Sequence, residues 1–437
     1  MFSYSRRNVT TPRRLAVFCL TTIAVSLQAG ELTLPNAEQQ ALSNDYGVQA
    51  LQAQSSTFAE QAVAADTWMD PVLSIGTMNL PGNNPDPFNQ GMFELKVEQM
   101  LPRGNSAGIQ RRKNELKGEK ASVAASDRQL TLLREVRLAW LDVWYWQKAL
   151  QQLQDDRHLF ESLLSVTESM YSQGRKNQQD LLRAELELSR LEDRIVSVNA
   201  GLKQSRAQLA RWIGQADLDT ISSELPEWQA IVDIDDQKLL KHPLVQTADL
   251  AINQSDQDVA LAKEGYKPQW GIEFKYGREM GDMSTMGAAE SRDKFSAMVM
   301  LDIPLFTANR QDRQLSASQY QREASTIQRL ETLRALQGQL QTESARFTGL
   351  QNRISLFREQ LIPQVISQSE ASLKAYQADV GDFADVIQAY KARLEMTLEY
   401  TRLQADTRQS YARLRYLLPA EQDRQLMTQQ SAQGTTL

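Results

Sequence analysis

The chain repeats one sequence pattern twice, with the two copies about 200 residues apart. Each copy begins with two segments of alternating apolar and polar residues, continues through a Pro turn, and ends in long stretches of helix-forming residues. Both copies should therefore build the same unit, a β-hairpin followed by a long helical hairpin. The matched positions are Phe93 with Phe295, Val97 with Val299, Pro102 with Pro304, Tyr171 with Tyr376, Gly174 with Asp379, and Leu181 with Val386.

The N-terminal segment predicts export from the cytoplasm. Four arginines precede an apolar run from Leu15 to Val25, which small and polar residues follow as far as Ala29. This is the layout of a secretory signal peptide, and we expect cleavage near Ala29. The run is shorter than the roughly 20 apolar residues of a transmembrane helix. The only cysteine, Cys19, lies within it, so the mature chain is expected to contain no disulfide.

Charge and composition exclude several classes of protein. The formal net charge is −6, and removal of the signal arginines makes the mature chain more acidic, which disfavours nucleic-acid binding. The 2 histidines, His158 and His242, have no metal-ligand spacing around them. The sequence contains no nucleophile–base pair, phosphate loop or Cys/His cluster, so it predicts no enzyme activity and no cofactor.

Long helices account for most of each copy. Between Pro102 and Pro226 the sequence has no proline and is rich in straight-chain helix formers. Pro363 should bend or locally shift the equivalent helix of the second copy.

The predicted organisation follows from these boundaries. The first half has a signal peptide (1–29) and a first repeat (30–226), with a short helix, a β-hairpin at 71–101 and long helices at 105–171 and 178–212. A connector (227–240) leads to the second repeat (241–420), with a short helix, a β-hairpin at 268–303 and long helices at 309–377 and 383–417. A disordered tail (421–437) is predicted from its Gln, Ser and Thr content.

The alternating segments have the pattern of membrane-spanning strands. Trp270, Ile272 and Phe274 alternate with polar residues, and each segment has about 9–11 residues, the span of a tilted strand through a bilayer. A half-buried sheet in a soluble domain has the same period of two. The export signal, and the lack of an apolar helical layer to cover the sheet, favour the membrane interpretation.

A membrane sheet of four strands cannot exist alone. Open sheet edges in hydrocarbon would have unpaired N–H and C=O groups, so the strands must close into a barrel, and the smallest barrels have about 8 strands. Three copies of the chain would close a barrel of about 12 strands with cyclic symmetry. The sequence therefore predicts a homotrimer.

These features resemble the TolC-type outer membrane efflux proteins over essentially the whole mature chain. The resemblance rests on the helical-hairpin turns, where that family has Tyr-x-x-Gly followed by an apolar pair and Ala. The matching residues are Tyr171, Gly174, Leu181, Leu182 and Ala184 in the first copy, and Tyr376, Val386, Ile387 and Ala389 in the second. Asp379 replaces the second glycine; aspartate can adopt the left-handed conformation, so we expect the turn to be kept.

The resemblance implies a mainly α-helical fold with transmembrane β-structure. The protomer would have two repeats of long helical hairpins and two β-hairpins, and the trimer would join its barrel to a periplasmic helical tunnel, with the connector in the equatorial region. The implied location is the outer membrane with a periplasmic extension. The implied partners are a periplasmic adaptor (membrane fusion protein) and an inner-membrane transporter of the resistance-nodulation-division type. Residues 70–81 and 99–102 look more like the heavy-metal branch than the drug branch.

The turns of the helical hairpins contain the candidate gate. Asp379, Asp382 and Asp385 lie within one short turn, and threefold symmetry would arrange them as acidic rings that favour cations. A solvated loop without a gating role would have the same composition. The resemblance implies that both turns contact the adaptor, through Tyr171, Gly174, Arg175, Lys176, Tyr376 and Gly381.

A methionine group is the candidate metal site. Met280, Met283 and Met286 are spaced by three in the loop of the second β-hairpin. Thioether ligands prefer soft ions such as Cu(I) or Ag(I). Methionine also serves as a flexible gap filler in loops, so both interpretations stay open.

The sequence predicts the outer membrane channel component of a tripartite efflux system. Such a channel passively conducts heavy-metal ions or small toxic compounds from a pump and adaptor to the exterior. One alternative is a secreted periplasmic coiled-coil adaptor or scaffold without a channel, and another is the outer membrane exit duct of type I secretion. The alternating strands disfavour the scaffold, because a scaffold has no use for a membrane-spanning sheet.

Overall fold

The structure of the chain is a computed structural model. It describes residues 31–80, 82, 85, 91–215, 218, 220–228, 235–279 and 293–434, the side chains of 428–434 excepted. The signal peptide predicted at 1–29 lies outside the described residues, and so do Met280, Met283 and Met286.

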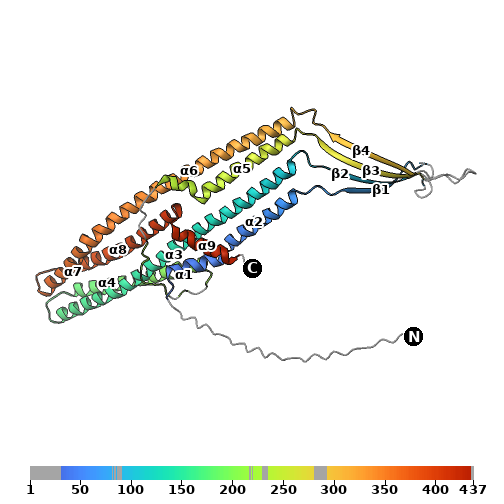
Figure 1. The fold of residues 1–437 in the computed structure, drawn as a ribbon. Helices are drawn as coiled ribbons and strands as arrows, with labels where there is room; N and C mark the ends of the chain where they lie inside the picture. The colour runs from blue at the N-terminus through green and yellow to red at the C-terminus, as the bar shows by residue number, and fades with distance from the viewer. Residues whose placement is uncertain are drawn as a thin grey trace, which may run out of the picture.

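The two repeats contain helices and strands in the same order. The first has α1 (Leu34–Asn44), α2 (Tyr46–Ala65), β1 (Val72–Met78), β2 (Met92–Met100), α3 (Ser106–Ser172) and α4 (Gln178–Ile213). The second has η1 (Asp236–Lys241), α5 (Pro243–Glu264), β3 (Gln269–Glu279), β4 (Asp293–Asp302), α6 (Gln311–Leu356), the π-helical turn η2 (Phe357–Leu361), α7 (Ile362–Gln377) and α8 (Phe383–Leu417), and α9 (Glu421–Gly434) follows. The molecule is elongated, with the strands at one end and the helical-hairpin turns at the other (Figure 1).

The described strands form one antiparallel sheet in which the repeats meet. Its order is β1-β2-β3-β4, and β2 of the first repeat pairs with β3 of the second, with Val97 opposite Phe274. Among the described residues, β1 and β4 each have one side without a partner strand. Helices α2, α3, α5 and α6 continue the strands in the same order (Figure 1). The protomer thus has two edges, one formed by β1 and α2 and the other by β4 and α6.

The long helix predicted at 309–377 is divided in the structure. It consists of α6, the π-helical turn η2 and α7, with Pro363 near the start of α7. Proline has no N–H to donate and its ring clashes with the carbonyl four residues earlier, so a regular α-helix cannot continue through it. The wider turn that precedes Pro363 accommodates this interruption.

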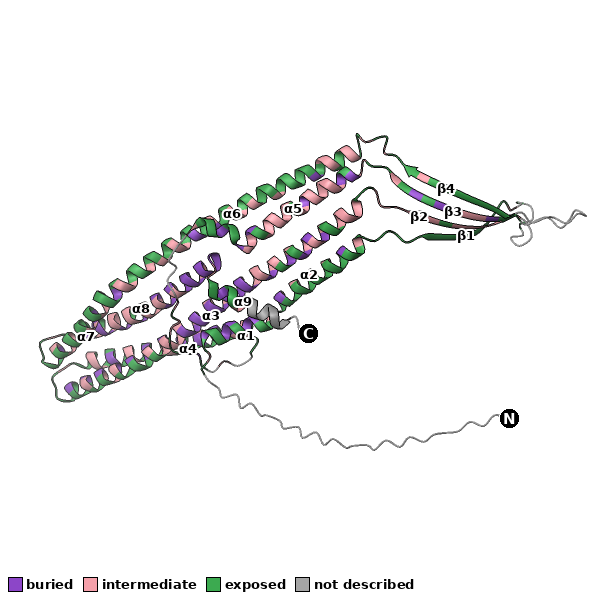
Figure 2. Ribbon diagram, viewed as in Figure 1, coloured by how far each residue is buried: buried purple, intermediate pink, exposed green. Residues whose placement is uncertain are grey.

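Three apolar cores lie away from the sheet, and one of them joins α3, α5, α6 and α8 around Leu130, Leu336 and Leu414. Another surrounds Trp140 of α3 and Leu209 of α4. The third lies toward the hairpin turns and combines Phe160 of α3, Leu191 of α4 and Tyr390 of α8, so it joins the two repeats. Figure 2 shows that α2, α6 and the outer strands β1 and β4 are largely exposed by comparison. Of the helices that the structure describes, none combines the length and the hydropathy needed to cross a membrane.

A buried ion cluster, the α9 clasp, consists of Glu38, Arg137, Arg415 and Asp423. The Asp423 carboxylate accepts hydrogen bonds from Arg137 Nη2 (2.6 Å) and Arg415 Nε (2.8 Å), and Arg137 Nε donates to Glu38 Oε1 (2.6 Å). Each of these side chains is at most 7 % exposed. The prediction of a disordered tail at 421–437 is therefore wrong for 421–434, because the clasp fixes α9 to α1, α3 and α8.

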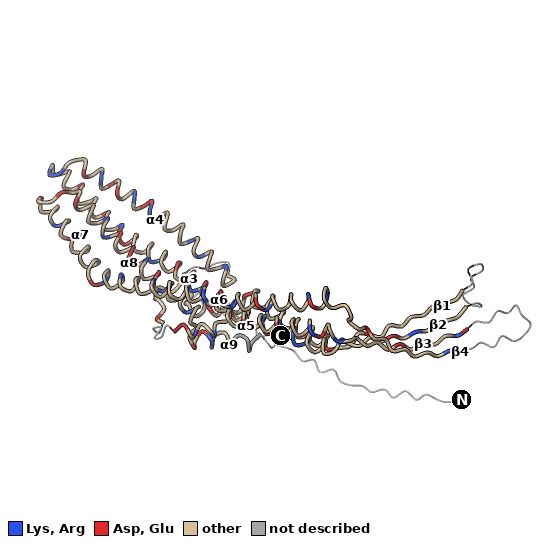
Figure 3. Tube along the Cα trace, turned by 90° about the horizontal axis from the view of Figure 1, so that it is seen from above, with Lys and Arg blue, Asp and Glu red and all other residues tan. Residues whose placement is uncertain are grey.

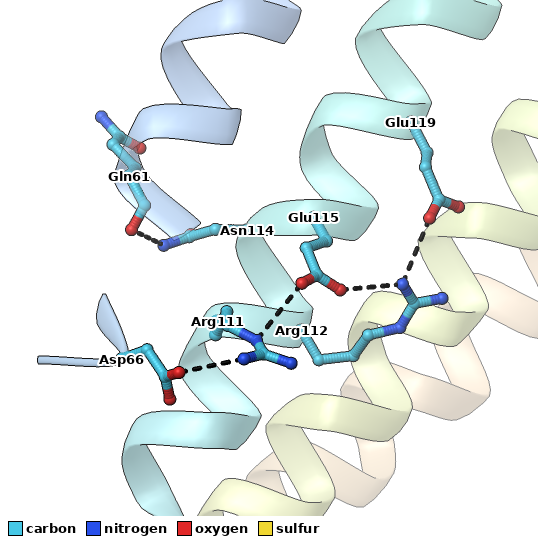
Figure 4. A network of polar contacts seen from close by, with 7 residues as sticks. All are labelled: Gln61, Asp66, Arg111, Arg112, Asn114, Glu115 and Glu119. Atoms are coloured by element: carbon cyan, nitrogen blue, oxygen red, sulfur yellow. Dashed lines mark hydrogen bonds and ion pairs between the residues drawn. The ribbon is translucent and has the colours of Figure 1, made fainter. Parts of the chain in front are cut away.

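Exposed charges of both signs are interspersed along the helices (Figure 3). In one group, Arg111 lies 2.9 Å from Asp66 and Arg112 lies 3.0 Å from Glu115 (Figure 4). These side chains are 36 to 50 % exposed. Solvent screening therefore limits each pair to about 1 kcal/mol or less.

Candidate functional site

The sheet has one strongly apolar face, which is exposed in the protomer. Phe295 is 80 % exposed and Ile75 is 65 % exposed. An exposed apolar surface of this kind indicates contact with a membrane or another protein. The apolar face consists of Leu73 and Ile75 of β1, Phe93, Leu95 and Val97 of β2, Trp270, Ile272, Phe274 and Tyr276 of β3, and Phe295, Val299 and Leu301 of β4.

The opposite, polar face has a ladder of charge pairs. Lys96 Nζ lies 2.9 Å from Glu98 Oε2 and 3.1 Å from Glu273 Oε2. Lys275 Nζ lies 3.5 Å from a carboxylate oxygen of both Glu94 and Glu273. A sheet with one face suited to hydrocarbon and the other to water has the pattern of a barrel wall.

The hairpin turns of the two repeats meet at the other end of the molecule. Gly174 in the α3–α4 turn has a φ of 71°, and Asp379 in the α7–α8 turn has a φ of 65°. Both values lie in the left-handed region, which glycine favours and aspartate tolerates at modest cost. The prediction that Asp379 keeps the turn is confirmed.

An ion pair links the two turns. Asp379 Oδ1 lies 2.8 Å from Lys176 Nζ, and Asp379 Oδ2 lies 3.6 Å from Arg175 Nη2. The hydrogen bond from Lys176 holds the pKa of the Asp379 carboxyl below its usual range, so this group is ionised at neutral pH. The sequence groups Asp379 with Asp382 and Asp385 as one acidic set. The structure corrects this, because the charge of Asp379 is paired within the protomer.

The other two aspartates are placed differently. Asp382 is the N-cap residue of α8 and Asp385 lies in the first turn of that helix, and both are exposed. Within the described residues neither carboxylate has an ion-pair partner. The positive end of the helix dipole stabilises negative charge at these positions. Asp382 and Asp385 are therefore the unpaired acidic groups of the second turn.

Tyr376 lies inside the protomer. Its side chain is 0 % exposed, its ring centroid lies 5.5 Å from that of Phe383, and Lys176 Nζ lies 4.8 Å from its ring centroid. Burial raises the pKa of the Tyr376 hydroxyl. The prediction of Tyr376 as an adaptor contact is wrong, because the side chain is covered by the protomer itself. The matching Tyr171 is 42 % exposed.

Solved structures of outer membrane proteins have the same fold. A crystal structure of CusC, which describes conformational changes accompanying folding and transmembrane channel formation, has a TM-score of 0.77 at 15 % identity and covers 88 % of this chain and 91 % of CusC. The outer membrane protein VceC of Vibrio cholerae has a TM-score of 0.74 at 16 % identity, covering 88 % and 95 %. The open-state MtrE channel of Neisseria gonorrhoeae has a TM-score of 0.70 at 14 % identity, covering 95 % and 97 %.

The second repeat matches a known family by sequence. Residues 236–419 match the family model described as outer membrane efflux protein. The family match thus covers the second repeat, and the solved structures share the fold of the whole protomer. A search of curated proteins finds no match to this chain. The predicted resemblance to TolC-type outer membrane efflux proteins is confirmed, and so is the two-repeat protomer of helical and β-hairpins; the heavy-metal branch stays a prediction.

Sequence reasoning missed the contacts between the hairpin turns of the two repeats. Lys176 and Asp379 occupy neighbouring positions in the two matched turns and have opposite charges. The opposite charges of Lys176 and Asp379 were the signal in the sequence. They indicate an ion pair only if the two turns lie side by side. Of the other predicted contact residues, Gly174 and Arg175 are exposed, and Lys176 and Gly381 are partly exposed.

Proposed function

We propose that the chain is the outer membrane channel of a tripartite efflux system and acts as a homotrimer. The observation that carries the proposal is the amphipathic sheet, which is open at β1 and β4 among the described residues. In a bilayer both edges must find partner strands, because hydrocarbon offers no other hydrogen-bonding groups. Joining β4 of one copy to β1 of the next, in three copies, closes a barrel of about 12 strands.

The helical layer supports the same assembly. Tyr46 and Val63 of α2 are 83 % and 66 % exposed, on one edge of the protomer. Ile327 and Leu330 of α6 are 59 % and 57 % exposed, on the other edge. In a closed ring the α2 edge of one copy packs against the α6 edge of its neighbour, which buries both sets. The helices then form a tunnel that continues the barrel.

The transported substrate passes along the polar face of the barrel and through the tunnel. The conduit itself is passive, and an inner-membrane transporter of the resistance-nodulation-division type drives transport through a periplasmic adaptor. The adaptor meets the hairpin turns, where Tyr171 and Arg175 are exposed. The substrates are heavy-metal ions or small toxic compounds. The protein resides in the outer membrane, and the hairpin turns lie in the periplasm.

Reconstitution tests the channel directly. The full chain is extracted from outer membranes with detergent, sized, and inserted into planar bilayers. We expect a trimer that produces discrete conductance steps. A monomer released from the periplasm without detergent would contradict the proposal and support the scaffold alternative.

The unpaired aspartates of the second turn are expected to set ion selectivity. Replacing Asp382 and Asp385 by Asn removes roughly six negative charges from the entrance of the trimer, so the preference for cations should fall, as for other charged rings. The reversal potential in a KCl gradient measures this preference. Asp193→Asn, an exposed change on α4, is the matched control and should leave the reversal potential unchanged. An equal shift in both proteins would remove Asp382 and Asp385 from the gate.

The ion pair between the turns is expected to favour the closed entrance. Asp379→Gly keeps the left-handed turn, because glycine adopts it freely, but removes the contacts with Lys176 and Arg175. We expect a roughly two- to five-fold rise in open probability, the scale of an exposed ion pair. Single-channel recording measures it. Asp379→Asn should behave in the same way, and a normal open probability in both variants would show that the pair has no role in closure.

A further inference from the structure

The methionines of the sheet are distributed unevenly between its faces. In the four described strands, all methionines lie on the polar face and none on the apolar face. They are Met78, Met92, Met100, Met298 and Met300. A methionine used as an apolar gap filler belongs on the apolar face, so this distribution requires another explanation.

Two of these methionines converge on one glycine. Met100 of β2 and Met300 of β4 are both opposite Gly271 of β3 in the pairing register. A Cβ atom on Gly271 would lie 2.6 Å from Met100 Sδ and 3.0 Å from Met300 Cε. The missing side chain therefore leaves space over Gly271 that the ends of both methionine side chains occupy. Met298, opposite Glu273, is the next residue of β4 on this face.

The neighbouring hard ligands are already occupied. Glu273 is 6 % exposed, and its carboxylate oxygens lie 3.1 Å from Lys96 Nζ and 3.5 Å from Lys275 Nζ. Within the described part of the chain, no group of three or more His, Cys, Asp or Glu side chains could hold a metal ion. Asp302, two residues beyond Met300 on this face, is paired with Arg103. The thioether sulfur atoms are thus the soft ligands on this part of the face. Thioethers bind soft ions such as Cu(I) and Ag(I) and bind hard cations poorly.

We propose that Met100 and Met300, with Met298 beside them, form a binding site for a soft monovalent cation, Cu(I) or Ag(I). The placement of this site in the channel lumen rests on the proposed function, whereas the site itself is built within one protomer. Threefold symmetry repeats it at one level of the barrel, next to the helices. Such a site binds soft cations in preference to hard ones. A site in a conduction pathway must also let its ion dissociate, which a small number of thioether ligands permits.

Silver binding to the detergent-solubilised full chain tests the site. Ag(I) is supplied as the nitrate in chloride-free buffer, and bound silver is measured after equilibrium dialysis. The double variant M100L/M300L, in which leucine conserves volume, should lose about one Ag(I) per chain relative to the unmodified protein. The control M78L/M92L changes methionines at the far end of the same face and should retain that ion. Equal binding by the unmodified protein and M100L/M300L overturns the site.

A second measurement separates the site from the channel. Silver X-ray absorption of the dialysed samples should show fewer sulfur neighbours in M100L/M300L than in M78L/M92L, and identical spectra overturn the site. In planar bilayers, Ag(I) should reduce the conductance of the unmodified protein more than that of M100L/M300L. Normal conductance with no difference in silver binding refutes the site alone. A difference in silver binding without any conductance refutes the channel alone.

Discussion

Replacing Ile327 and Leu330 by aspartate is expected to leave folded protomers that no longer assemble. Both side chains point away from the protomer core, at 59 % and 57 % exposure, so the protomer itself loses little. In the proposed ring each is buried against the next copy, where burial of a large aliphatic side chain contributes about 1.5–3 kcal/mol. Every interface of the ring would lose both contributions and would bury two unpaired charges. Light scattering coupled to size exclusion in detergent measures the change from trimer to monomer.

A control on the same helix separates this effect from a general effect of charge. Gln328 is exposed and lies about 100° around the helix from Ile327, so Gln328→Asp adds a charge away from the proposed contact. This variant should remain trimeric. Circular dichroism should show the same helix content in all three proteins. A stable trimer of the double aspartate variant would contradict the proposed α2–α6 contact.

Removal of Asp423 is expected to give the largest loss of protomer stability. Asp423→Ala leaves Arg137 and Arg415 buried without their shared carboxylate, and breaking a buried pair in this way costs about 3–5 kcal/mol. Denaturant unfolding followed by circular dichroism measures the loss. The matched control is Asp66→Ala, which breaks the exposed pair with Arg111 and should cost about 1 kcal/mol or less. Similar losses in both variants would show that the clasp stabilises the protomer no more than an exposed ion pair does.

The stabilisation by Asp423 should also depend on pH. Burial alone would raise the pKa of the Asp423 carboxyl, but Arg137 and Arg415 outweigh burial and hold it below its ordinary value of 3.8. In that range the unfolded chain binds more protons than the folded chain, so folding stability falls as pH is lowered. The difference between the unmodified protein and Asp423→Ala should be full above about pH 5 and should shrink below about pH 4.

The strands and long helices were predictable because their signals are local. An alternation such as Trp270, Ile272 and Phe274 specifies a strand with two distinct faces, and a proline-free run of helix formers specifies α3. The pairing within each hairpin follows from the repeat, since each copy contributes one hairpin, whereas the pairing of β2 with β3 came from the structure. No long-range contact was needed for any of these predictions.

The clasp and the buried tyrosine were not predictable in the same way. Asp423 is 286 residues from Arg137 along the chain, so the composition of the tail gave no sign of this partner. Tyr376 has the motif position of Tyr171, but only the second repeat has Phe383, where the first has Gln178. Phe383 thus covers Tyr376 in the second repeat, and the first repeat has no aromatic residue at that position. The contact between Tyr376 and Phe383 depends on how α7 and α8 pack, which no local sequence pattern specifies.

The π-helical turn before Pro363 changes the rotation of α7 about the helix axis relative to the end of α3. The number of residues in the long helix stays the same. Helix α3 has 67 residues, and its counterpart consists of segments of 46, 5 and 16 residues, which make the same total. A π-helical turn advances by a smaller angle per residue than an α-helix, so the phase beyond it changes by roughly a quarter of a rotation. The two arms thus have the same number of residues but present different sides at their ends. The two hairpins therefore differ in angle rather than in reach, and at their ends Tyr376 is buried whereas Tyr171 is exposed.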